Sequence, residues 1–257
     1  MEKKYDVIII GAGIAGMTAA IYIARANKKV LVLEACVEGG QIINTVDIEN
    51  WPGDFGVSGV DLVRKIKKQA EELGVEFEYT EVEKVEKSGD GWVVADEDGE
   101  GLGARSVILA VGTEPRKLSE KQTAEVGRRA ISYCATCDGA LYKNKPVVVV
   151  GSGNTAKHEI AYLKNIASIV YHIHHDDPIP EDVAAVFVAI GRVPNTGFCN
   201  GLVDLDESGY IVAGEDCKTS VRGIFVAGDC RTKSLRQLVT AASDGAIAAT
   251  EAIKFLG

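Results

Sequence analysis

Two cysteines separated by two residues carry the clearest chemistry in this chain of 257 residues. Cys134 and Cys137 have the spacing at which a disulfide can close, open to two thiols and pass two electrons in either direction. Such a pair works when one thiol is accessible and has a lowered pKa. Asp138 follows directly and can donate or accept a proton for the leaving thiolate. These three residues are the candidate catalytic group.

The same spacing forms half of a four-cysteine zinc site, and a buried structural pair is a further alternative. A zinc site needs a second pair, but the other cysteines stand singly, at Cys36, Cys199, Cys217 and Cys230. The histidines lie between positions 158 and 175 without a thiolate or carboxylate spacing that supports a metal site. We therefore favour redox chemistry, predict no metal, and interpret the single cysteines as small core or surface residues.

Composition and charge exclude several classes of partner. A net charge of -9 argues against nucleic acid and against anionic membranes. No apolar run approaches the roughly 20 residues of a membrane span. The first residues lead directly into a predicted strand, so we expect no signal peptide and a cytoplasmic location.

A complete dinucleotide-binding pattern opens the chain. An apolar strand over 6–10 leads into Gly11, Gly13 and Gly16, then a helix over 17–26 and a second strand over 30–33, which ends at Glu34. The glycines would make the turn, admit a pyrophosphate and allow the helix to pack closely. The carboxylate would bind a ribose 2′-hydroxyl, which favours FAD or NAD. A glycine-rich turn without ligand is the alternative.

A second, shorter pattern follows the cysteines. A strand over 146–150 leads into Gly151, Gly153 and Ala156, then a helix to about 165 and a strand over 168–173. The next apolar strand, 185–190, begins only a few residues later, whereas a helical crossover needs a dozen residues or more. The second nucleotide-binding unit is therefore predicted to be truncated, and its glycines could hold a pyrophosphate or only pack closely.

The remaining predicted elements are a helix over 60–73, a meander of strands at 76–79, 82–87 and 92–96, a strand over 106–111, a short strand over Gly209–Val212, an apolar strand over 223–229, and a helix over 236–256.

Together these pieces resemble low-molecular-weight thioredoxin reductase, a flavoprotein of the pyridine nucleotide-disulfide oxidoreductase family. The resemblance covers nearly the whole chain and rests on the motifs at 11–16, 49–53, 134–139, 151–156, 228–229 and 236–237. It implies an α/β fold with a discontinuous, Rossmann-like FAD-binding domain over 1–112 and 193–257, which includes the meander. A truncated Rossmann-like domain over 113–192 would carry the cysteines.

The resemblance also implies roles for individual residues. FAD would be bound by Gly11, Gly13, Ile14, Ala15, Gly16, Glu34, Gly40, Gln41, Asn50, Gly112, Gly228, Asp229, Arg236, Gln237 and Leu238. Cys137 would face the flavin, Cys134 would attack the substrate disulfide, and Asp138 would move the proton. The implied partner is thioredoxin or a thioredoxin-like protein, and the implied assembly is a homodimer.

One departure concerns the electron donor. Where the family has a basic cluster for the 2′-phosphate of NADPH, this chain has His174, His175, Asp176 and Asp177. Two carboxylates repel a phosphate, and the rest of the family's NADPH domain is missing from the sequence. NAD(P)H is therefore a doubtful donor, and a ferredoxin-type protein is an alternative. A dithiol oxidase that uses oxygen, and an FAD-binding protein without catalysis, are the other functions to weigh.

Overall fold

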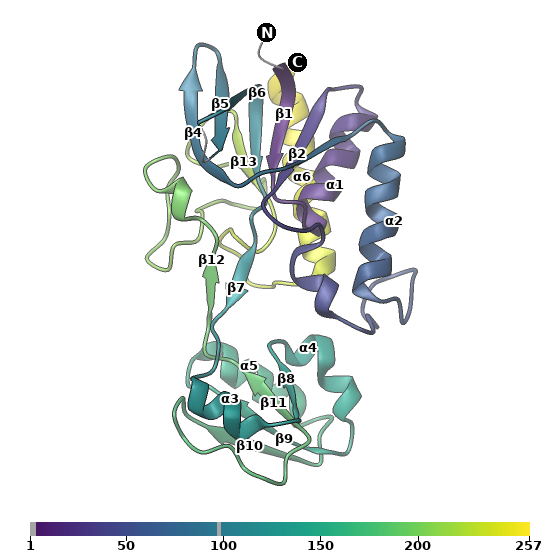
Figure 1. The fold of residues 1–257 in the computed structure, drawn as a ribbon, viewed down its shortest axis with the longest axis vertical. Coiled ribbons are helices and arrows are strands. Elements are labelled where there is room, and N and C mark those ends of the chain that lie inside the picture. The colour runs from purple at the N-terminus through teal and green to yellow at the C-terminus, as the bar shows by residue number, and fades with distance from the viewer. Residues whose placement is uncertain (1–3, 97–98) are drawn as a thin grey trace. The chain divides into compact units, whose positions relative to one another are not determined.

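The computed structural model describes residues 4–96 and 99–257. The chain forms two compact units, Met1–Thr113 with Pro194–Gly257, and Glu114–Val193 (Figure 1). Two short strands, β7 (Thr113–Pro115) and β12 (Arg192–Pro194), pair with each other where the chain passes from one unit to the other. Within the described ranges, no helix is both long enough and apolar enough to cross a membrane.

The first unit is built on one mixed sheet. Its order is β3 (Glu76–Tyr79), β2 (Val30–Glu34), β1 (Lys4–Ile10), β6 (Gly101–Leu109), β5 (Gly91–Asp96) and β4 (Val82–Ser88), and β13 (Ile224–Val226) also pairs with β6. The strands β1, β2, β3 and β13 run parallel to their neighbours, whereas β4 and β5 form the antiparallel meander. In open sheets of this kind, ligands bind outside the carboxyl ends of the parallel strands.

Alternate residues of β1 face opposite cores, as expected for a strand. Val7 and Ile9 lie in a core with the helices α1 (Ile14–Arg25) and α6 (Leu238–Leu256). Ile8 and Ile10 lie in a second core with Trp92 of the meander. The helices α1 and α6 pack side by side (Figure 1), and α2 (Gly59–Glu72) packs beside α1.

The second unit contains a smaller parallel sheet in the order β10 (Ile169–Ile173), β9 (Pro146–Val150), β11 (Ala185–Val188) and β8 (Ala130–Ser132). Its helices are α3 (Glu120–Val126), α4 (Ala135–Asp138) and α5 (Asn154–Leu163). The chain returns from β10 to β11 across residues 174–184, all of them described, and forms no helix there. The predicted fold class, a Rossmann-like unit with a truncated second unit that carries the cysteines, is confirmed.

The predicted strand over Gly209–Val212 is wrong. The carboxylate of Asp206 accepts the backbone N–H groups of Ser208 and Tyr210, which closes a turn, and Ile211 makes only isolated bridges. The last helix begins at Leu238 rather than at 236, and α1 begins at Ile14 rather than at 17. Short 3₁₀ helices, η1 (Gly40–Asn44), η2 (Gly139–Tyr142) and η3 (Gly197–Cys199), complete the fold.

Candidate functional site

The first glycine turn joins β1 to α1 and leaves the start of the helix open. A side chain at Gly16 would meet the carbonyl oxygen of Gly11 at 1.9 Å, so glycine is required for this close approach. Gly13 is the N-cap of α1, and no side chain caps the helix or places a negative charge in its first turn. The space beside Gly13 is open, since a Cβ at this position would meet no other atom within 4 Å. The backbone N–H groups of Ile14 and Ala15 therefore begin a helix whose positive end can receive a phosphate.

Glu34, the last residue of β2, lies at the same turn. Its Oε2 accepts the backbone N–H of Ala12 at 2.8 Å, and its Oε1 accepts that of Cys36 at 3.2 Å. An ionised carboxylate has about four acceptor sites, so each oxygen keeps capacity for a ribose hydroxyl. The structure thus places the predicted acid beside the predicted phosphate turn.

The loop residues of the first unit converge on the same region from other parts of the sequence. Gly40 lies near Gly13, since a Cβ at Gly40 would be 3.9 Å from the Cα of Gly13. The side-chain amide of Gln41 donates to the carbonyl of Thr113, directly after Gly112. Asn50 donates from Nδ2 to Oε1 of Gln237 at 3.1 Å. The loop after β2 is therefore tied both to the end of the β6 segment and to the start of α6.

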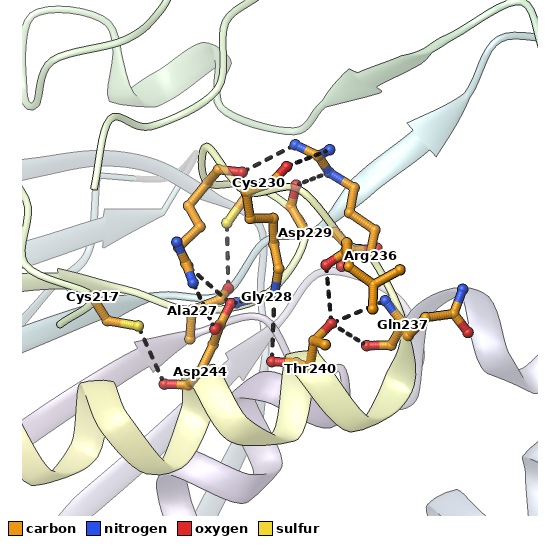
Figure 2. A network of polar contacts seen from close by, with 12 residues as sticks. Cys217, Ala227, Gly228, Asp229, Cys230, Arg236, Gln237, Thr240 and Asp244 are labelled. Carbon is orange, nitrogen blue, oxygen red and sulfur yellow. Dashed lines mark hydrogen bonds and ion pairs between the residues drawn. The ribbon is translucent and has the colours of Figure 1, made fainter. Parts of the chain in front are cut away.

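The segment from Gly228 to Leu238 leads from β13 into α6 (Figure 2). Gly228 has φ +82°, and a Cβ there would lie 2.9 Å from the Cβ of Ala15, so the turn fits against α1 only as glycine. The guanidinium of Arg236 donates to the carbonyls of Asp229, Arg231 and Lys233 at 3.1, 3.1 and 3.3 Å. Arg236 thereby fixes the backbone of this loop, and Leu238 starts the helix.

In the second unit, Cys134 and Cys137 form a disulfide, with their Cα atoms 5.3 Å apart. Cys134 is the N-cap of α4, and its Sγ accepts the backbone N–H of Cys137 at 3.2 Å. Both cysteines are half-buried. When the disulfide is reduced, this N–H can stabilise a thiolate at Cys134, which is the form that attacks a disulfide.

Asp138 is held beside the disulfide by a buried serine. Its Oδ2 accepts the Ser132 hydroxyl at 2.6 Å, and its backbone N–H donates to the carbonyl of Cys134 at 3.1 Å. The Ser132 oxygen also accepts the N–H of Cys134 at 3.2 Å. The structure therefore brings together the three predicted catalytic residues, and it adds Ser132, which the sequence did not single out.

Glu159 of α5 is a second carboxyl near the disulfide. Its Oε1 lies 3.5 Å from the backbone N of Ala135, the first residue of α4. Its Oε2 is buried and has no hydrogen-bond partner among the described residues. Burial raises the pKa of Glu159 to about 7, although the N–H of Ala135 and the charge of Arg192 act in the other direction. A carboxyl in this state can hold a proton near neutral pH.

The second glycine turn joins β9 to α5 and is contacted by His172 of β10 and by His174, which directly follows that strand. His172 Nε2 lies 2.7 Å from the carbonyl oxygen of Gly151, and His174 Nδ1 lies 2.7 Å from Oγ of Ser152. The backbone N–H of His174 donates to Asp177 at 2.8 Å. Asp176 is exposed. The turn with Gly151, Gly153 and Ala156 is formed, and the segment beside it, which includes His175, carries three imidazoles and two carboxylates.

The single cysteines are placed for packing. Cys199, Cys217 and Cys230 are buried, and burial raises the pKa of each thiol to about 12. Cys36 is exposed. In residues 4–96 and 99–257, no three side chains of histidine, cysteine, aspartate or glutamate gather in a way that could hold a metal.

Comparisons with known proteins agree with this geometry. The family model for pyridine nucleotide-disulphide oxidoreductases matches residues 5–183 and 176–245. A thioredoxin reductase of Listeria innocua is 37% identical over 303 aligned positions, which cover 99% of this chain and 95% of the relative. The solved thioredoxin reductase of Streptococcus pyogenes superposes with a TM-score of 0.91 at 34% identity, covering 100% of this chain and 99% of the other.

A ferredoxin-flavin thioredoxin reductase from Clostridium acetobutylicum also superposes, with a TM-score of 0.62 and 27% identity over 99% of this chain and 98% of the other. The chain belongs to the pyridine nucleotide-disulphide oxidoreductase family. It is an oxidoreductase with a redox-active disulfide and the fold of thioredoxin reductases. Membership therefore confirms the resemblance inferred from its motifs.

The family comparison also locates what is missing. An alignment of 303 positions over 257 residues leaves at least 46 positions, the difference between the two lengths, without a residue of this chain. The two segments matched by the family model meet and overlap at 176–183. This is the return from β10 to β11, where the sequence predicted that the second nucleotide-binding unit is cut short. The unmatched alignment positions and the overlap of the two matched segments are both consistent with truncation of the second nucleotide-binding unit between β10 and β11.

The first unit fits FAD, the cofactor of this family. The uncapped helix start at Gly13, the open space beside Gly13, and the adjacent carboxylate of Glu34 match a pyrophosphate and an adenosine ribose. Glu34 would repel a phosphorylated ribose, so an unphosphorylated dinucleotide is the better match. Which of the other predicted residues touch the cofactor stays a prediction.

No sequence pattern singled out three polar residues that contact the predicted FAD site of the first unit or the disulfide site of the second. Ser132 lies two positions before the first cysteine, Glu159 lies in a helix with other polar residues, and Asp244 lies within α6. Their partners are 6, 24 and 16 positions away in the sequence. Only the folded chain shows that each one contacts a predicted site segment.

Proposed function

We propose that this chain is an FAD-dependent disulfide reductase that reduces thioredoxin or a thioredoxin-like protein, with an electron donor other than NADPH. The observation that carries the proposal is the Cys134–Cys137 disulfide with Asp138 held beside it. The named relatives from Listeria and Streptococcus, which are thioredoxin reductases, support thioredoxin as the substrate.

Cys134, Cys137 and Asp138 would carry out the disulfide exchange in two steps. Asp138 takes the proton of the Cys134 thiol, and the Cys134 thiolate attacks one sulfur of the substrate disulfide, forms a mixed disulfide and releases one substrate thiolate, which takes that proton back from Asp138. The Cys137 thiol then gives its proton to Asp138 and attacks Sγ of Cys134, so that the Cys134–Cys137 disulfide forms again and the second substrate thiolate leaves and takes that proton. The substrate gains two electrons and two protons in total. The protein dithiol supplies the electrons and is oxidised.

FAD, when bound, would supply the two electrons that reduce the Cys134–Cys137 disulfide again. The residues of the first unit would bind and orient it: the helix start at Gly13 would hold the pyrophosphate, Glu34 the adenosine ribose, and Asp229 the ribityl chain. Gln237 and Leu238 would lie by the flavin ring. In the second unit, Cys137 would face the flavin and Cys134 the substrate. These assignments follow the family resemblance.

The groups beside the second glycine turn disfavour NADPH as the electron donor. NADPH carries a 2′-phosphate that needs charge-assisted hydrogen bonds from cations, each worth about 1.5–3 kcal/mol. At this turn the chain presents Asp177, bonded to His174, and the exposed Asp176. The two matches of the family model also overlap at 176–183, the return from β10 to β11 where the unit is predicted to be truncated. We therefore expect the affinity for NADPH to be about a hundredfold or more lower than in a site with the family's basic cluster. A ferredoxin-type protein is the proposed donor.

The decisive experiment assays thioredoxin reduction by the FAD-loaded protein with NADPH, NADH and reduced ferredoxin in parallel. We expect the ferredoxin assay to be the fastest of the three. Fast thioredoxin reduction with NADPH would overturn the proposed donor but leave the disulfide reductase in place. The function itself would be overturned if no donor supported thioredoxin reduction and if protein that had first been reduced with dithionite also failed to reduce thioredoxin. Rapid reoxidation of the reduced flavin by air, with slow thioredoxin reduction, would instead favour a dithiol oxidase.

We further propose a cytoplasmic homodimer, as the resemblance implies. Light scattering of the purified protein checks the assembly, since a dimer has twice the chain mass of 27.3 kDa. A monomer that retains thioredoxin reduction would show that pairing is not needed for the reaction.

A further inference from the structure

A buried ionic cluster lies under the Gly228–Asp229 turn (Figure 2). Asp244, in the second turn of α6, points its carboxylate at the turn, and its Oδ2 accepts the backbone N–H of Gly228 at 3.0 Å. The same carboxylate accepts hydrogen bonds from Nε and Nη2 of Arg231 at 3.0 and 2.9 Å, and from Nζ of Lys233 at 2.6 Å. A single side chain therefore bonds three positions of the loop that leads into α6.

The cluster is shielded from solvent, so its bonds are stronger than surface ion pairs. The side chains of Arg231, Lys233 and Asp244 are 2%, 5% and 5% exposed. Burial alone would raise the pKa of Asp244, but the hydrogen bonds and charges of Arg231 and Lys233 hold it below its ordinary value. Arg231 and Lys233 both face Asp244, and the second carboxylate near Arg231, that of Glu215 at 3.8 Å, is 94% exposed, so removing Asp244 leaves the buried cations without a buried counter-charge.

The position of Asp244 connects three segments that are predicted to bind FAD. The next residue, Gly245, packs against α1, because a Cβ there would lie 2.2 Å from the carbonyl oxygen of Ala15. Gly228 fits against Ala15 from the other side, since a Cβ at Gly228 would lie 2.9 Å from that of Ala15. The start of α1, the Gly228–Asp229 turn and the first half of α6 thus meet around one carboxylate.

We propose that Asp244 is a positioning residue for FAD, which fixes the Gly228–Asp229 turn relative to α6 and to the phosphate turn of α1. This inference rests on the proposed binding of FAD by the first unit. Asp244 acts through the backbone of Gly228 and through the Arg231 and Lys233 side chains, and needs no contact with the cofactor. Loss of its carboxylate would loosen the turn while leaving every predicted FAD contact residue in the sequence.

The test compares two variants of the full-length protein. Lys233→Met keeps the Asp244 bonds to Gly228 and Arg231. The double variant Asp244→Asn with Lys233→Met removes the carboxylate together with one cation, so the net charge of the cluster stays the same as in the unaltered protein. FAD is titrated into each apoprotein, with flavin fluorescence giving the dissociation constant and visible circular dichroism reporting how the ring is held. We expect the double variant to bind FAD about tenfold or more weakly than Lys233→Met, with an altered dichroism spectrum.

Val85→Ala is the stability control, since it removes buried methyl groups from β4 in the opposite core. It should lower the thermal midpoint without changing FAD affinity. Equal FAD affinity and equal dichroism in the double variant and Lys233→Met would overturn the role of Asp244. If the double variant does not fold, Asp244→Glu, which moves the carboxylate by one methylene, replaces it, and unchanged affinity there would overturn the role as well. An unaltered protein that binds no FAD would overturn the proposed function, which is a separate result.

Discussion

The hydroxyl of Ser132 donates a 2.6 Å hydrogen bond to the carboxylate of Asp138 and accepts the backbone N–H of Cys134 at 3.2 Å. Ser132 is 4% exposed, so water does not replace it at either bond. One buried side chain therefore joins the proposed proton donor to the backbone of the proposed attacking cysteine. The arrangement therefore fixes the Asp138 carboxylate beside the disulfide.

We expect Ser132→Ala to slow disulfide exchange by about three- to thirtyfold, because a charge-assisted hydrogen bond is lost and Asp138 is free to turn away. The measurement is the rate of thioredoxin reduction by the prereduced protein. Ser168→Ala, which alters an exposed serine of the same unit, is the matched control. Identical rates for the two variants would show that Ser132 does not position Asp138.

The two cysteines should behave differently when each is replaced by serine. Cys134→Ser should leave a thiolate at Cys137 that gives a long-wavelength absorption band with bound flavin, and it should form no mixed disulfide with thioredoxin. Cys137→Ser should trap that mixed disulfide, because the resolving thiol is absent. Absorption spectra and non-reducing gels check both results. The same spectrum and the same trapping in both variants would contradict the assigned roles.

Glu159 should make the second unit less stable as the pH rises. Its pKa is raised from 4.5 to about 7 in the folded chain, so its contribution to stability is complete below about 4.5 and is lost as the pH passes 7. The loss is on the order of 3 kcal/mol from the size of the shift. Glu159→Gln carries no charge at any pH and should remove this dependence.

Hydrogen exchange of peptides from β9 measures the second unit by itself, whereas both tryptophans, Trp51 and Trp92, belong to the first. Exchange is compared between Glu159→Gln and the unaltered chain at each pH, which cancels the intrinsic pH dependence of the chemistry. Glu181→Gln, at an exposed site of the same unit, is the control. A pH profile that Glu159→Gln leaves unchanged would show that Glu159 is not the titrating group.

Local patterns predicted the elements that build both units. The apolar runs of β1, β2 and β9 and the glycine turns after β1 and β9 follow from neighbouring residues, because buried parallel strands and tight turns have direct sequence signals. The predicted strand at 209–212 failed because the side chain of Asp206 competes for the backbone, and such turn chemistry is weakly coded in apolar periodicity.

The candidate site was predictable where it is built from motifs and not where it is built from tertiary contacts. The CxxC pair and its neighbouring acid are contiguous, and the structure closes the disulfide as predicted. Ser132, Glu159 and Asp244 act through hydrogen bonds across 6, 24 and 16 positions of sequence. Serine and acidic residues are frequent on any surface, so their burial against a site segment is a property of the fold.

The last prediction restores positive charge at the second glycine turn. His175 and Asp176 are both exposed at its mouth, with side chains 44% and 76% exposed. His175→Arg combined with Asp176→Asn adds a phosphate-binding cation and removes one repelling carboxylate. Asparagine is chosen because position 176 has φ +80°, a conformation that asparagine tolerates. Asp177 is left in place because it accepts the backbone N–H of His174 at 2.8 Å.

We expect the half-saturating NADPH concentration for flavin reduction to fall by about tenfold, as one new charge-assisted hydrogen bond to the 2′-phosphate would allow. The rate at saturation should rise little, because the truncated sheet is unchanged. Anaerobic mixing with NADPH over a range of concentrations, followed by flavin bleaching, measures both values. NADH is the matched control, since it lacks the phosphate and should change by less than about twofold. An equal gain for NADH would mean that the new charge attracts any dinucleotide, and no gain for NADPH would mean that carboxylate repulsion at this turn does not limit its binding.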